Sequence, residues 1–571
     1  MNLDNKFERG IETKIAGPED NISVHIDSRH DRKVNTGSLN KRQAWVFGQI
    51  FSSGFFHDAE SLTSQILRMR EFSPGAFKNL ISAFNGNFAI IVKDRDRCFV
   101  AVDRLRSVPL FYTRKNGTLR ISNSARSLRG YLGEEGIDPL SSYEFYRAGY
   151  VTGSDTLFKD IKQLRAGEYL YSEGNVKQIN VERYYEYWPR HISDSPEAVL
   201  LKELDAVLVR TFGRLCSGAE GRTLAVPLSG GLDSRVVGTM LKRLDYKDVI
   251  CFSYGRKGNA ESRKSKEVAD ALGFRWFFIE YTPSKWKGWK RSKEFQDYFK
   301  YADNFASLAH IDDWAAVWEL KIGGAVPEDA IFVPGHTGDF ISGGHLRYVY
   351  GAKEEINEDD LMERILEKHY GLWPVNSQDN KLNIILLEKL KAQLSEFEYI
   401  TQQALASWYE LWEWQERQAK FIVNSVRAYE FWGYDWRIPL WDNELMDFWC
   451  SVPYTYKLDK RLYRAYLTAK NAYGVFASTT NTTLHNRFMS HVAERRYSLI
   501  GKPVFDLYRA YRRLNDYARG AKATYGMYSY ADFLLNFRGI RNPNSLLVKE
   551  YLDGLRAGGP ALKDNNQFKE G

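Results

Sequence analysis

The chain has 571 residues, of which 44% are hydrophobic, and a formal net charge of +8 at pH 7. This length exceeds what one hydrophobic core usually supports, so we expect a globular protein of two or three domains. Its four cysteines lie far apart without metal-ligand spacing, which argues against a disulfide framework or a zinc site. The sequence contains no apolar run of transmembrane length and no signal region, so we expect a cytoplasmic protein.

The N-terminal third contains short apolar segments separated by Gly and Asn turns. These segments are typical of buried or alternating strands and comprise residues 45–51, 84–92, 98–104 and 110–112. An aromatic run at residues 184–189 follows, and we expect a domain boundary near residues 190–200. Apolar residues at helical spacing then predict a helix from Glu197 to Leu215.

The next strand pattern, Thr223 to Pro227, runs into the sequence Leu228-Ser229-Gly230-Gly231-Leu232-Asp233-Ser234. Paired glycines let a backbone approach an anion closely, and a helix opening near Asp233 would point its N–H groups at that anion. The two serines add hydroxyl donors. A carboxylate in such a loop is favourable if it holds a magnesium ion that bridges phosphates. The loop is not a Walker A motif, and the plainer alternative is a Gly-Gly turn with an Asp N-cap.

A second strand pattern, residues 331–333, also enters a glycine-rich loop with one acid, Gly335-His336-Thr337-Gly338-Asp339. Two strand-end loops, each with an Asp, suit a doubly wound parallel sheet that binds nucleotide at its carboxyl edge.

A further helix is predicted over residues 416–430. Spacing places four polar residues along one face of it, namely Arg417, Lys420, Asn424 and Arg427. They either grip an anionic substrate or are solvated charges on the helix surface.

The C-terminal part, residues 486–571, is predicted to be a basic, tyrosine-rich helical extension. Its basic residues include Arg487, Arg495, Arg496, Lys502, Arg509, Arg512, Arg513, Arg519 and Lys522. They indicate an anionic partner, such as a glycan, a lipid-linked phosphate or an acidic protein, or else a solvated helix face, which is the favoured interpretation. No nucleic-acid recognition motif is present.

The two loops resemble the S-G-G-L-D-S and G-E-G-S-D-E-x-x-G-G-Y motifs of the asparagine synthetase family. Residues 251–255 are similar to the family's second strand, which contacts adenine. Residues 103–112 resemble the D-R-x-G-x-x-P-L-Y-Y motif of class II amidotransferase domains. The resemblance implies an α/β protein with an N-terminal αββα amidotransferase-like domain, residues 1–190. A doubly wound parallel-sheet synthetase domain of the adenine nucleotide α-hydrolase type would follow at residues 195–485, with a helical C-terminal part.

Glutamine hydrolysis in class II domains requires a cysteine at the mature N-terminus, whose α-amine serves as base. Asn2 follows the initiator Met here, and Cys98 lies within a strand pattern. We therefore expect no glutaminase activity. Ammonia would come from solution or from a separate amidotransferase subunit, unless the acceptor is another amine.

The resemblance also implies the chemistry of the synthetase domain. A carboxylate attacks the α-phosphorus of ATP, magnesium pyrophosphate leaves, and an amine then displaces AMP. Asp233 and Asp339 are the implied magnesium ligands. The implied nucleotide-binding residues are Leu228, Ser229, Gly230, Gly231, Asp233, Ser234, Phe252, Ser253, Tyr254 and Gly335.

Three positions depart from the family motifs. His336 replaces a Glu or Tyr, and it either accepts the proton of the amine at a near-neutral pKa or shapes the pocket. Phe340 and His345 indicate a substrate other than aspartate. The family's late catalytic lysine is missing near residues 477–482, so that Lys457, Lys460 and Arg461 are its nearest substitutes.

The forms of the second loop and of residues 429–442 resemble members from bacterial surface-polysaccharide synthesis. This resemblance implies amidation of a uronic acid on a nucleotide- or lipid-linked sugar, by an enzyme that is cytoplasmic or peripheral at the inner membrane surface. A lasso-peptide cyclase and an ammonia-dependent asparagine synthetase are alternatives. A non-catalytic relative that binds nucleotide or a partner is another, although retention of both acids argues against it. A homodimer is an open alternative for the oligomeric state.

Overall fold

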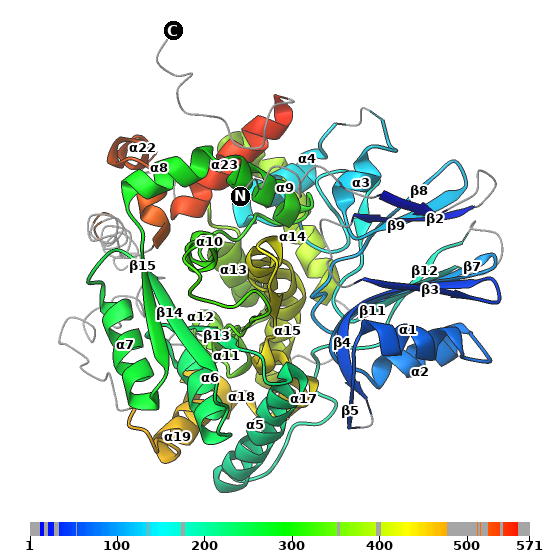
Figure 1. Cartoon of the computed structure of the whole chain (residues 1–571). Coiled ribbons are helices and arrows are strands. Elements are labelled where there is room, and N and C mark those ends of the chain that lie inside the picture. The colour runs from blue at the N-terminus through cyan, green and yellow to red at the C-terminus, as the bar shows by residue number, and fades with distance from the viewer. Residues whose placement is uncertain are drawn as a thin grey trace.

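The computed structural model describes residues 12–15, 21–27, 34–52, 54–133, 136–172, 178–350, 355–394, 401–476, 511, 514, 523–536 and 541–557. Two β-sheets from the N-terminal third of the chain stack on one side of the molecule (Figure 1). A third sheet, enclosed by helices, makes up the other side.

The first N-terminal sheet has the strand order β1-β2-β9-β8-β10, and the second has the order β12-β11-β7-β6-β4-β3 with β5 paired to β4. The strands of the first are Glu12–Ile15, Ile22–Asp27, Thr118–Ser122, Phe111–Lys115 and Lys162–Gln163. Those of the second are Asn180–Arg183, Glu168–Ser172, Arg97–Val102, Asn85–Asp94, Arg42–Ser52 and Asn35–Leu39, with β5 at Phe55–His57. The four predicted strand segments of this region are confirmed.

Side-chain alternation in β4 explains why this domain has layers. Trp45 and Phe47 lie in the core between the two sheets. Ala44 and Val46 point to the opposite face, into the core beneath α1 (Ala59–Leu67) and α2 (Pro74–Ser82). With α3 (Ala125–Arg129) and α4 (Pro139–Ala148) beyond the first sheet, the predicted αββα arrangement is confirmed (Figure 1).

The third sheet contains five parallel strands in the order β15-β14-β13-β16-β17. They are Arg275–Glu280, Val249–Gly255, Leu224–Pro227, Ile331–Phe332 and Asp435–Trp436. The chain proceeds from β13 outward through β14 to β15, and then returns to the other side of β13 for β16. The strand order therefore reverses between β13 and β16, where open α/β sheets bind their ligands. The loops after these two strands carry the acids that the sequence singles out.

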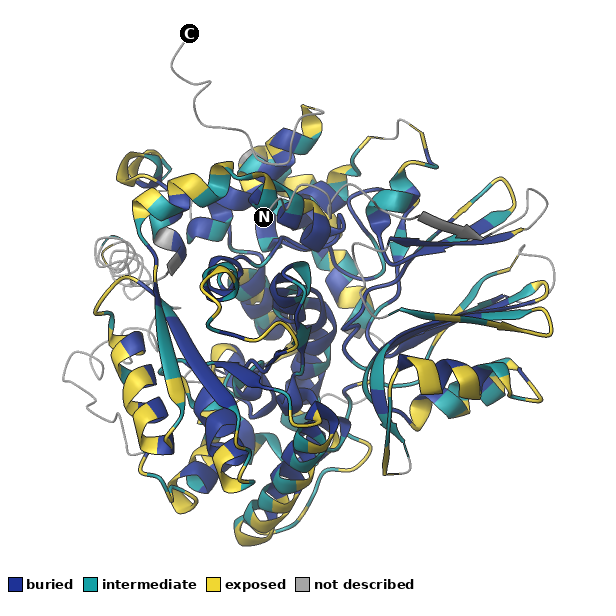
Figure 2. Ribbon diagram, viewed as in Figure 1, coloured by how far each residue is buried: buried dark blue, intermediate teal, exposed yellow. Residues whose placement is uncertain are grey.

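Helices surround this sheet, and their solvent-facing sides are exposed, whereas β13, β14 and β16 are largely buried and the edge strand β15 is mostly half-buried (Figure 2). The predicted helix after the boundary is α5, Glu197–Ala219. The α-helices that follow are α6 Leu232–Arg243, α7 Ala260–Leu272, α8 Pro283–Arg291, α9 Lys293–Asp303, α10 Trp314–Ile322, α11 Gly338–Ile341, α12 Leu346–Tyr350, α13 Glu358–His369, α14 Asn380–Leu394, α15 Gln402–Glu413, α16 Arg427–Phe431, α17 Asn443–Ser451, α18 Tyr454–Lys457, α19 Arg461–Ala469, α22 Tyr530–Leu535 and α23 Pro543–Arg556. Short 3-10 helices are η2 Ser377–Asp379, η5 Pro439–Trp441, η6 Leu458–Lys460 and η7 Ala523–Met527.

The helix expected over residues 416–430 differs from the prediction. The chain leaves α15 in a π-helix, η3 (Trp414–Ile422), passes through a 3-10 helix, η4 (Val423–Val426), and then enters α16. Hydrogen bonds in a π-helix run from i to i+5, so α-helical spacing does not apply. The single face expected from residue spacing is therefore absent.

The described C-terminal helix is part of the main body. Tyr551 of α23 stacks on Phe145 of α4 at a centroid distance of 5.2 Å, and Leu547 and Val548 are buried in the same core as the parallel sheet. Most of the basic stretch between Arg487 and Lys522 lies outside the described residues. Among the helices that the structure describes, none has the length and apolar character needed to cross a bilayer.

Candidate active site

The loop after β13 leaves the start of α6 open. Gly231 is the N-cap residue, and no side chain accepts a hydrogen bond from the first turn. The alternative of an Asp-capped turn is therefore wrong. Ser229 N–H donates to Ser234 Oγ at 3.0 Å, and Gly231 N–H donates to Ser229 Oγ at 3.1 Å. The serines hold the loop in shape, and the unpaired amides of the helix start are suited to an anion.

Arg235 also holds this loop, and sequence analysis missed it. Its guanidinium donates to the carbonyls of Gly231, Gly230 and Val475 at 3.0, 3.0 and 2.7 Å. The side chain is buried. Turning these carbonyls toward Arg235 keeps their negative ends away from the phosphate-facing side of the loop.

The two acidic loops meet, as predicted. The Asp339 N–H donates to Asp233 Oδ2 at 2.8 Å. Glycines permit this approach, since a Cβ on Gly335 would lie 2.6 Å from Ser234 N and one on Gly338 would lie 2.7 Å from Asp233 Oδ1. Such distances are too short for a side chain, so the glycine content of the second loop follows from its contact with the first.

The electrostatics of the two acids suit a cation. Burial raises the pKa of Asp233, and the neighbouring charge of Asp339 raises it further. Asp233 Oδ1 is buried and has no hydrogen-bond partner of normal geometry. Burial also acts to raise the pKa of Asp339, but the hydrogen bond and charge of His345 outweigh it, and the net shift is downward.

The residues present fit magnesium, the metal that the family implies. Two carboxylates from strand-end loops provide hard oxygen ligands, and one of them, Asp233, has a buried oxygen without a hydrogen bond of normal geometry. Among the described residues, no group of three or more His, Cys, Asp and Glu forms a complete metal cage. This matches an ion that takes its remaining ligands from phosphate oxygens and water.

A buried charge chain stands behind Asp339. His345 Nε2 lies 3.2 Å from Asp339 Oδ2, and its Nδ1 contacts Glu413 Oε1. Glu413 is fully buried and also faces Lys368 at 3.3 Å and Arg417 at 3.6 Å. The histidine therefore orients the acid in the way that carboxylate–histidine pairs orient metal ligands.

Of the three proposed lysine substitutes, the structure places one at the acids. The charge of Lys460 lowers the pKa of both Asp233 and Asp339. Its backbone has φ 59°, and its Cε would collide with a Cβ on Gly344. Lys457 is instead buried in an ion pair with Glu410, and Arg461 pairs with Glu197 at 2.6 Å.

His336 contacts Ser425, whose Oγ lies 3.3 Å from Nδ1. Burial lowers the pKa of His336 to about 4, the charge of Asp313 opposes this, and that of His310 adds to it. The near-neutral pKa expected from the sequence is not found. The imidazole is neutral at physiological pH and is a weak proton acceptor.

The nucleotide residues expected on β14 lie beside the first loop. The Phe252 side chain is fully buried, and its carbonyl accepts a hydrogen bond from Leu228 N–H at 2.8 Å. Ser253 is also buried. Tyr254 stacks on Tyr281 and donates to Asp313. The side chains of Phe252 and Tyr254 therefore support the site from behind.

All four predicted substrate-binding residues have partners inside the protein. Lys420 is fully buried, pairs with Glu416 at 2.6 Å and donates to the carbonyls of Val151 and Gly153. Asn424 donates to Ala302 O at 2.8 Å. Arg427 pairs with Glu430 at 2.7 Å and donates to Ser107 O. Arg417 is part of the charge chain behind Asp339.

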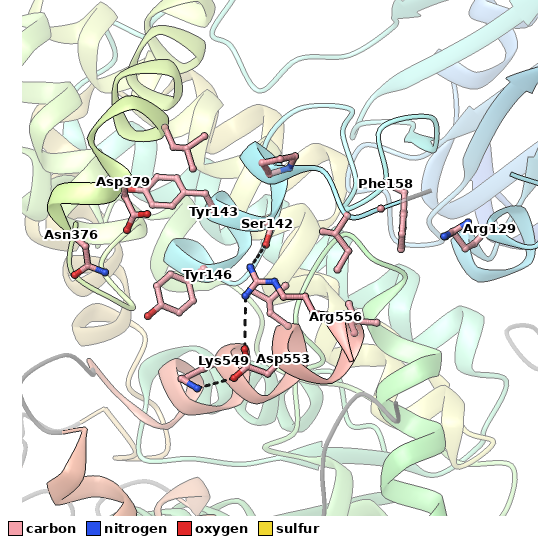
Figure 3. A pocket seen from close by; sticks show the side chains of 16 residues that line it. Arg129, Ser142, Tyr143, Tyr146, Phe158, Asn376, Asp379, Lys549, Asp553 and Arg556 are labelled. Atoms are coloured by element: carbon pink, nitrogen blue, oxygen red, sulfur yellow. Dashed lines mark hydrogen bonds and ion pairs between the residues drawn. The ribbon is translucent and has the colours of Figure 1, made fainter. Parts of the chain in front are cut away.

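A separate cavity of about 800 Å³ lies between α4, α23 and residues 376–382 (Figure 3). Arg556 reaches across it from α23 and donates to Ser142 Oγ at 3.0 Å. None of the predicted site residues lines this cavity. The candidate active site is therefore the loop pair at the sheet edge.

An amidotransferase-like αββα domain joined to a parallel sheet with two acidic, glycine-rich loops is the α/β architecture that the resemblance of the sequence implies. Comparison with family models agrees. Residues 207–470 match the model for asparagine synthase, and residues 58–188 match the model for a glutamine amidotransferase domain. The two matches support the asparagine synthetase family, the first over the parallel-sheet domain and the second over most of the amidotransferase-like domain.

Similarities to solved structures are weak. Glutamine phosphoribosylpyrophosphate amidotransferase from Bacillus subtilis, complexed with ADP and GMP, is 12% identical; the match covers 52% of this chain and 62% of that one, with a TM-score of 0.18. The NH3-dependent NAD synthetase of Campylobacter jejuni, in complex with nitrate, is 11% identical over 38% of this chain and 94% of that one, with a TM-score of 0.19. This chain thus spans less than two thirds of the first. No curated protein sequence matches significantly.

Proposed function

We propose that this protein adenylates a carboxylate with ATP and transfers the acyl group to ammonia or another amine, with release of pyrophosphate and AMP. The contact between Asp233 and Asp339 beside the uncapped start of α6 carries the proposal. The substrate we propose is a uronic acid on a nucleotide- or lipid-linked sugar, destined for a surface polysaccharide.

The chain's own residues have distinct roles in this proposal. The amides of the first turn of α6 and the loop that Arg235 braces bind the β- and γ-phosphates of ATP. Asp233 and Asp339 would hold magnesium, and the ion would supply positive charge next to the pyrophosphate group. Lys460 adds a fixed positive charge beside both acids and takes the place of the family's late lysine. His336, which stays neutral, shapes the pocket for the amine.

The proposal also includes an N-terminal domain without glutaminase activity. Cys98 lies within β7, is fully buried, and has a thiol pKa that burial raises to about 12. A thiol of this kind is inert as a nucleophile. Ammonia from solution or from a separate subunit would therefore serve as the nitrogen source.

The test is to measure pyrophosphate and AMP release from MgATP and ammonium with different acids. The panel contains UDP-glucuronate, a lipid-diphosphate-linked uronate, free aspartate and a peptide with an acidic side chain. Release with either uronate supports the proposal, and glutamine should not replace ammonium. Asp233→Ala should abolish release while circular dichroism shows an unchanged fold.

Other outcomes point elsewhere. Release with the peptide alone would make the protein a macrolactam cyclase, and release with aspartate alone would make it an asparagine synthetase. If wild type binds MgATP but releases no pyrophosphate or AMP with any of the acids, the result would contradict a catalytic role. It would favour a relative that only binds nucleotide.

A further inference from the structure

Arg106 occupies a backbone position that favours glycine. The chain turns after β7, where Arg106 N–H donates to Asp103 O at 3.1 Å, and Arg106 has a φ of 53°. This left-handed region is strained for residues with a Cβ. The amidotransferase motif that residues 103–112 resemble has Gly at this place, so the chain carries a large cationic side chain where the backbone favours none.

The guanidinium of Arg106 is buried without a counter-ion. The residue is 6% exposed, and its Nε is buried without an acceptor. Among the described residues, its guanidinium makes no hydrogen bond or ion pair; its Cζ lies over the ring of Phe111, 5.5 Å from the centroid. Burial, and next the charge of Arg427, lower the pKa of Arg106 to about 9, against the opposing charges of Glu416 and Asp103. A buried unpaired charge is unfavourable unless a ligand compensates it.

The acids around Arg106 already have partners. Glu416 pairs with Lys420 at 2.6 Å and accepts a hydrogen bond from Gly153 N–H at 2.9 Å. Asp103 accepts hydrogen bonds from the N–H groups of Phe88 and Leu105, at 2.9 and 2.7 Å.

Arg427 approaches from the synthetase side. It donates to Ser107 O and pairs with Glu430, so it adds a second cation without neutralising the first. The guanidinium of Arg106 at the boundary between the two domains thus has no direct anionic partner among the described residues, although the charges of Glu416 and Asp103 act on it through space. A planar guanidinium pairs best with the two oxygens of a carboxylate or phosphate.

We propose that Arg106, assisted by Arg427, binds the carboxylate or phosphate group of a small-molecule ligand at the boundary between the amidotransferase-like domain and the segment from η4 to α16. This segment also reaches the catalytic loops, because Ser425 contacts His336. The N-terminal domain would then act as a binding module. Binding at this site does not require the ATP chemistry proposed above, so the two proposals fail separately.

The test is isothermal titration calorimetry of the full chain with sodium phosphate and with sodium glucuronate at constant ionic strength. The α6 site is first filled with magnesium and α,β-methylene-ATP, so that phosphate does not bind there. Wild type should bind at least one of the two anions, and the preferred anion identifies the ligand group. Neutral glucose is the control ligand.

Arg106→Gly is the informative variant because it relieves the backbone strain and removes the unpaired charge. We expect anion binding at least tenfold weaker, with an equal or higher Tm in the absence of anions. Arg106→Gln keeps most of the side-chain volume and should also lose binding, which separates charge from packing. Absence of anion binding by wild type, or undiminished binding by both variants, would overturn the proposal.

Discussion

Lys460 places a cation beside both acids, at a position other than that of the family's late lysine. It follows α18 by three residues, and its charge reaches both Asp233 and Asp339. Its side chain is half-buried and forms no ion pair with the described residues. A cation held near two acids without a partner of its own is suited to a polyphosphate that binds between them.

Replacing Lys460 with alanine should therefore slow the adenylation step. We expect the kcat for pyrophosphate release to fall by roughly 10²–10³, the usual loss when one preorganised charge is removed. Lys460→Arg should retain part of the rate. Because the ammonium pairs with no described carboxylate, Tm should change little.

Lys470→Ala provides the matched control for this measurement. Lys470 is an exposed lysine just beyond α19 that pairs with Asp205 at 3.2 Å, away from the acids. The Lys470→Ala variant should release pyrophosphate at the same rate as wild type. A Lys460→Ala rate within twofold of wild type would remove Lys460 from the mechanism.

Single residues were predictable from sequence where local pattern determines their place. Asp233 and Ser234 follow a strand and two glycines, and the structure places them at a strand end as expected. His345 and Glu413 are 68 positions apart, and nothing local to either residue indicates their contact. The low pKa of His336 likewise depends on burial by distant segments.

At the scale of elements, the loop after β16 is fixed by its fit against the start of α6. Gly335 has an ordinary φ, so its role is to allow a close approach and not an unusual backbone conformation. The adjacent Gly338 meets Asp233 in the same way. The spacing of the two acids is therefore set by backbone contacts between two elements.

Gly335→Ala should separate the loops. A Cβ would lie 2.6 Å from Ser234 N and 2.9 Å from the Asp233 carbonyl carbon, both of them backbone atoms that cannot move aside independently. Displacing an acid by several tenths of an ångström should lower kcat/KM for ATP by about 10–100-fold, since misplacement of 1 Å can cost about 10²-fold.

Steady-state kinetics of pyrophosphate release check this prediction. Gly213→Ala is the control, because Gly213 lies in α5, where a Cβ would meet no atom within 4 Å. This control should be as active as wild type and equally or more stable, since Ala favours helix. Unchanged kcat/KM in Gly335→Ala would show that the loops are not in close contact in solution.

Elements were predictable where periodicity is regular. Both β4 and α5 follow their sequence patterns closely. The π-helix η3 was not predictable, because its apolar and charged residues are compatible with α-helical spacing. It is specified by contacts from outside the segment, such as that of the Trp414 Nε1–H, which donates to Arg104 O at 2.9 Å.

At the scale of the whole molecule, buried and partly buried polar contacts join the two domains. Arg214 of α5 pairs with Asp442 at 2.6 Å, and Asp442 in turn accepts a hydrogen bond from Asn85 of β6 at 3.0 Å. Lys420 of η3 donates to the carbonyls of Val151 and Gly153 at 2.8 and 2.6 Å. We infer that the amidotransferase-like domain and the synthetase domain unfold together.

Lys420→Met tests this coupling and the role of Lys420 at once. Removing the ammonium leaves Glu416 charged and buried, and frees two buried carbonyls, which should cost about 3–5 kcal/mol of stability. Scanning calorimetry should show one transition at a lower temperature, whereas KM for the carboxylate, measured well below Tm, should not change. Adding Glu416→Gln should recover part of the lost stability.

The exposed pair of Lys391 and Asp359 provides the control. Lys391→Met should change the free energy of unfolding by less than about 1 kcal/mol. An unchanged Tm with a raised KM would instead make Lys420 a substrate-binding residue, as residue spacing alone suggests.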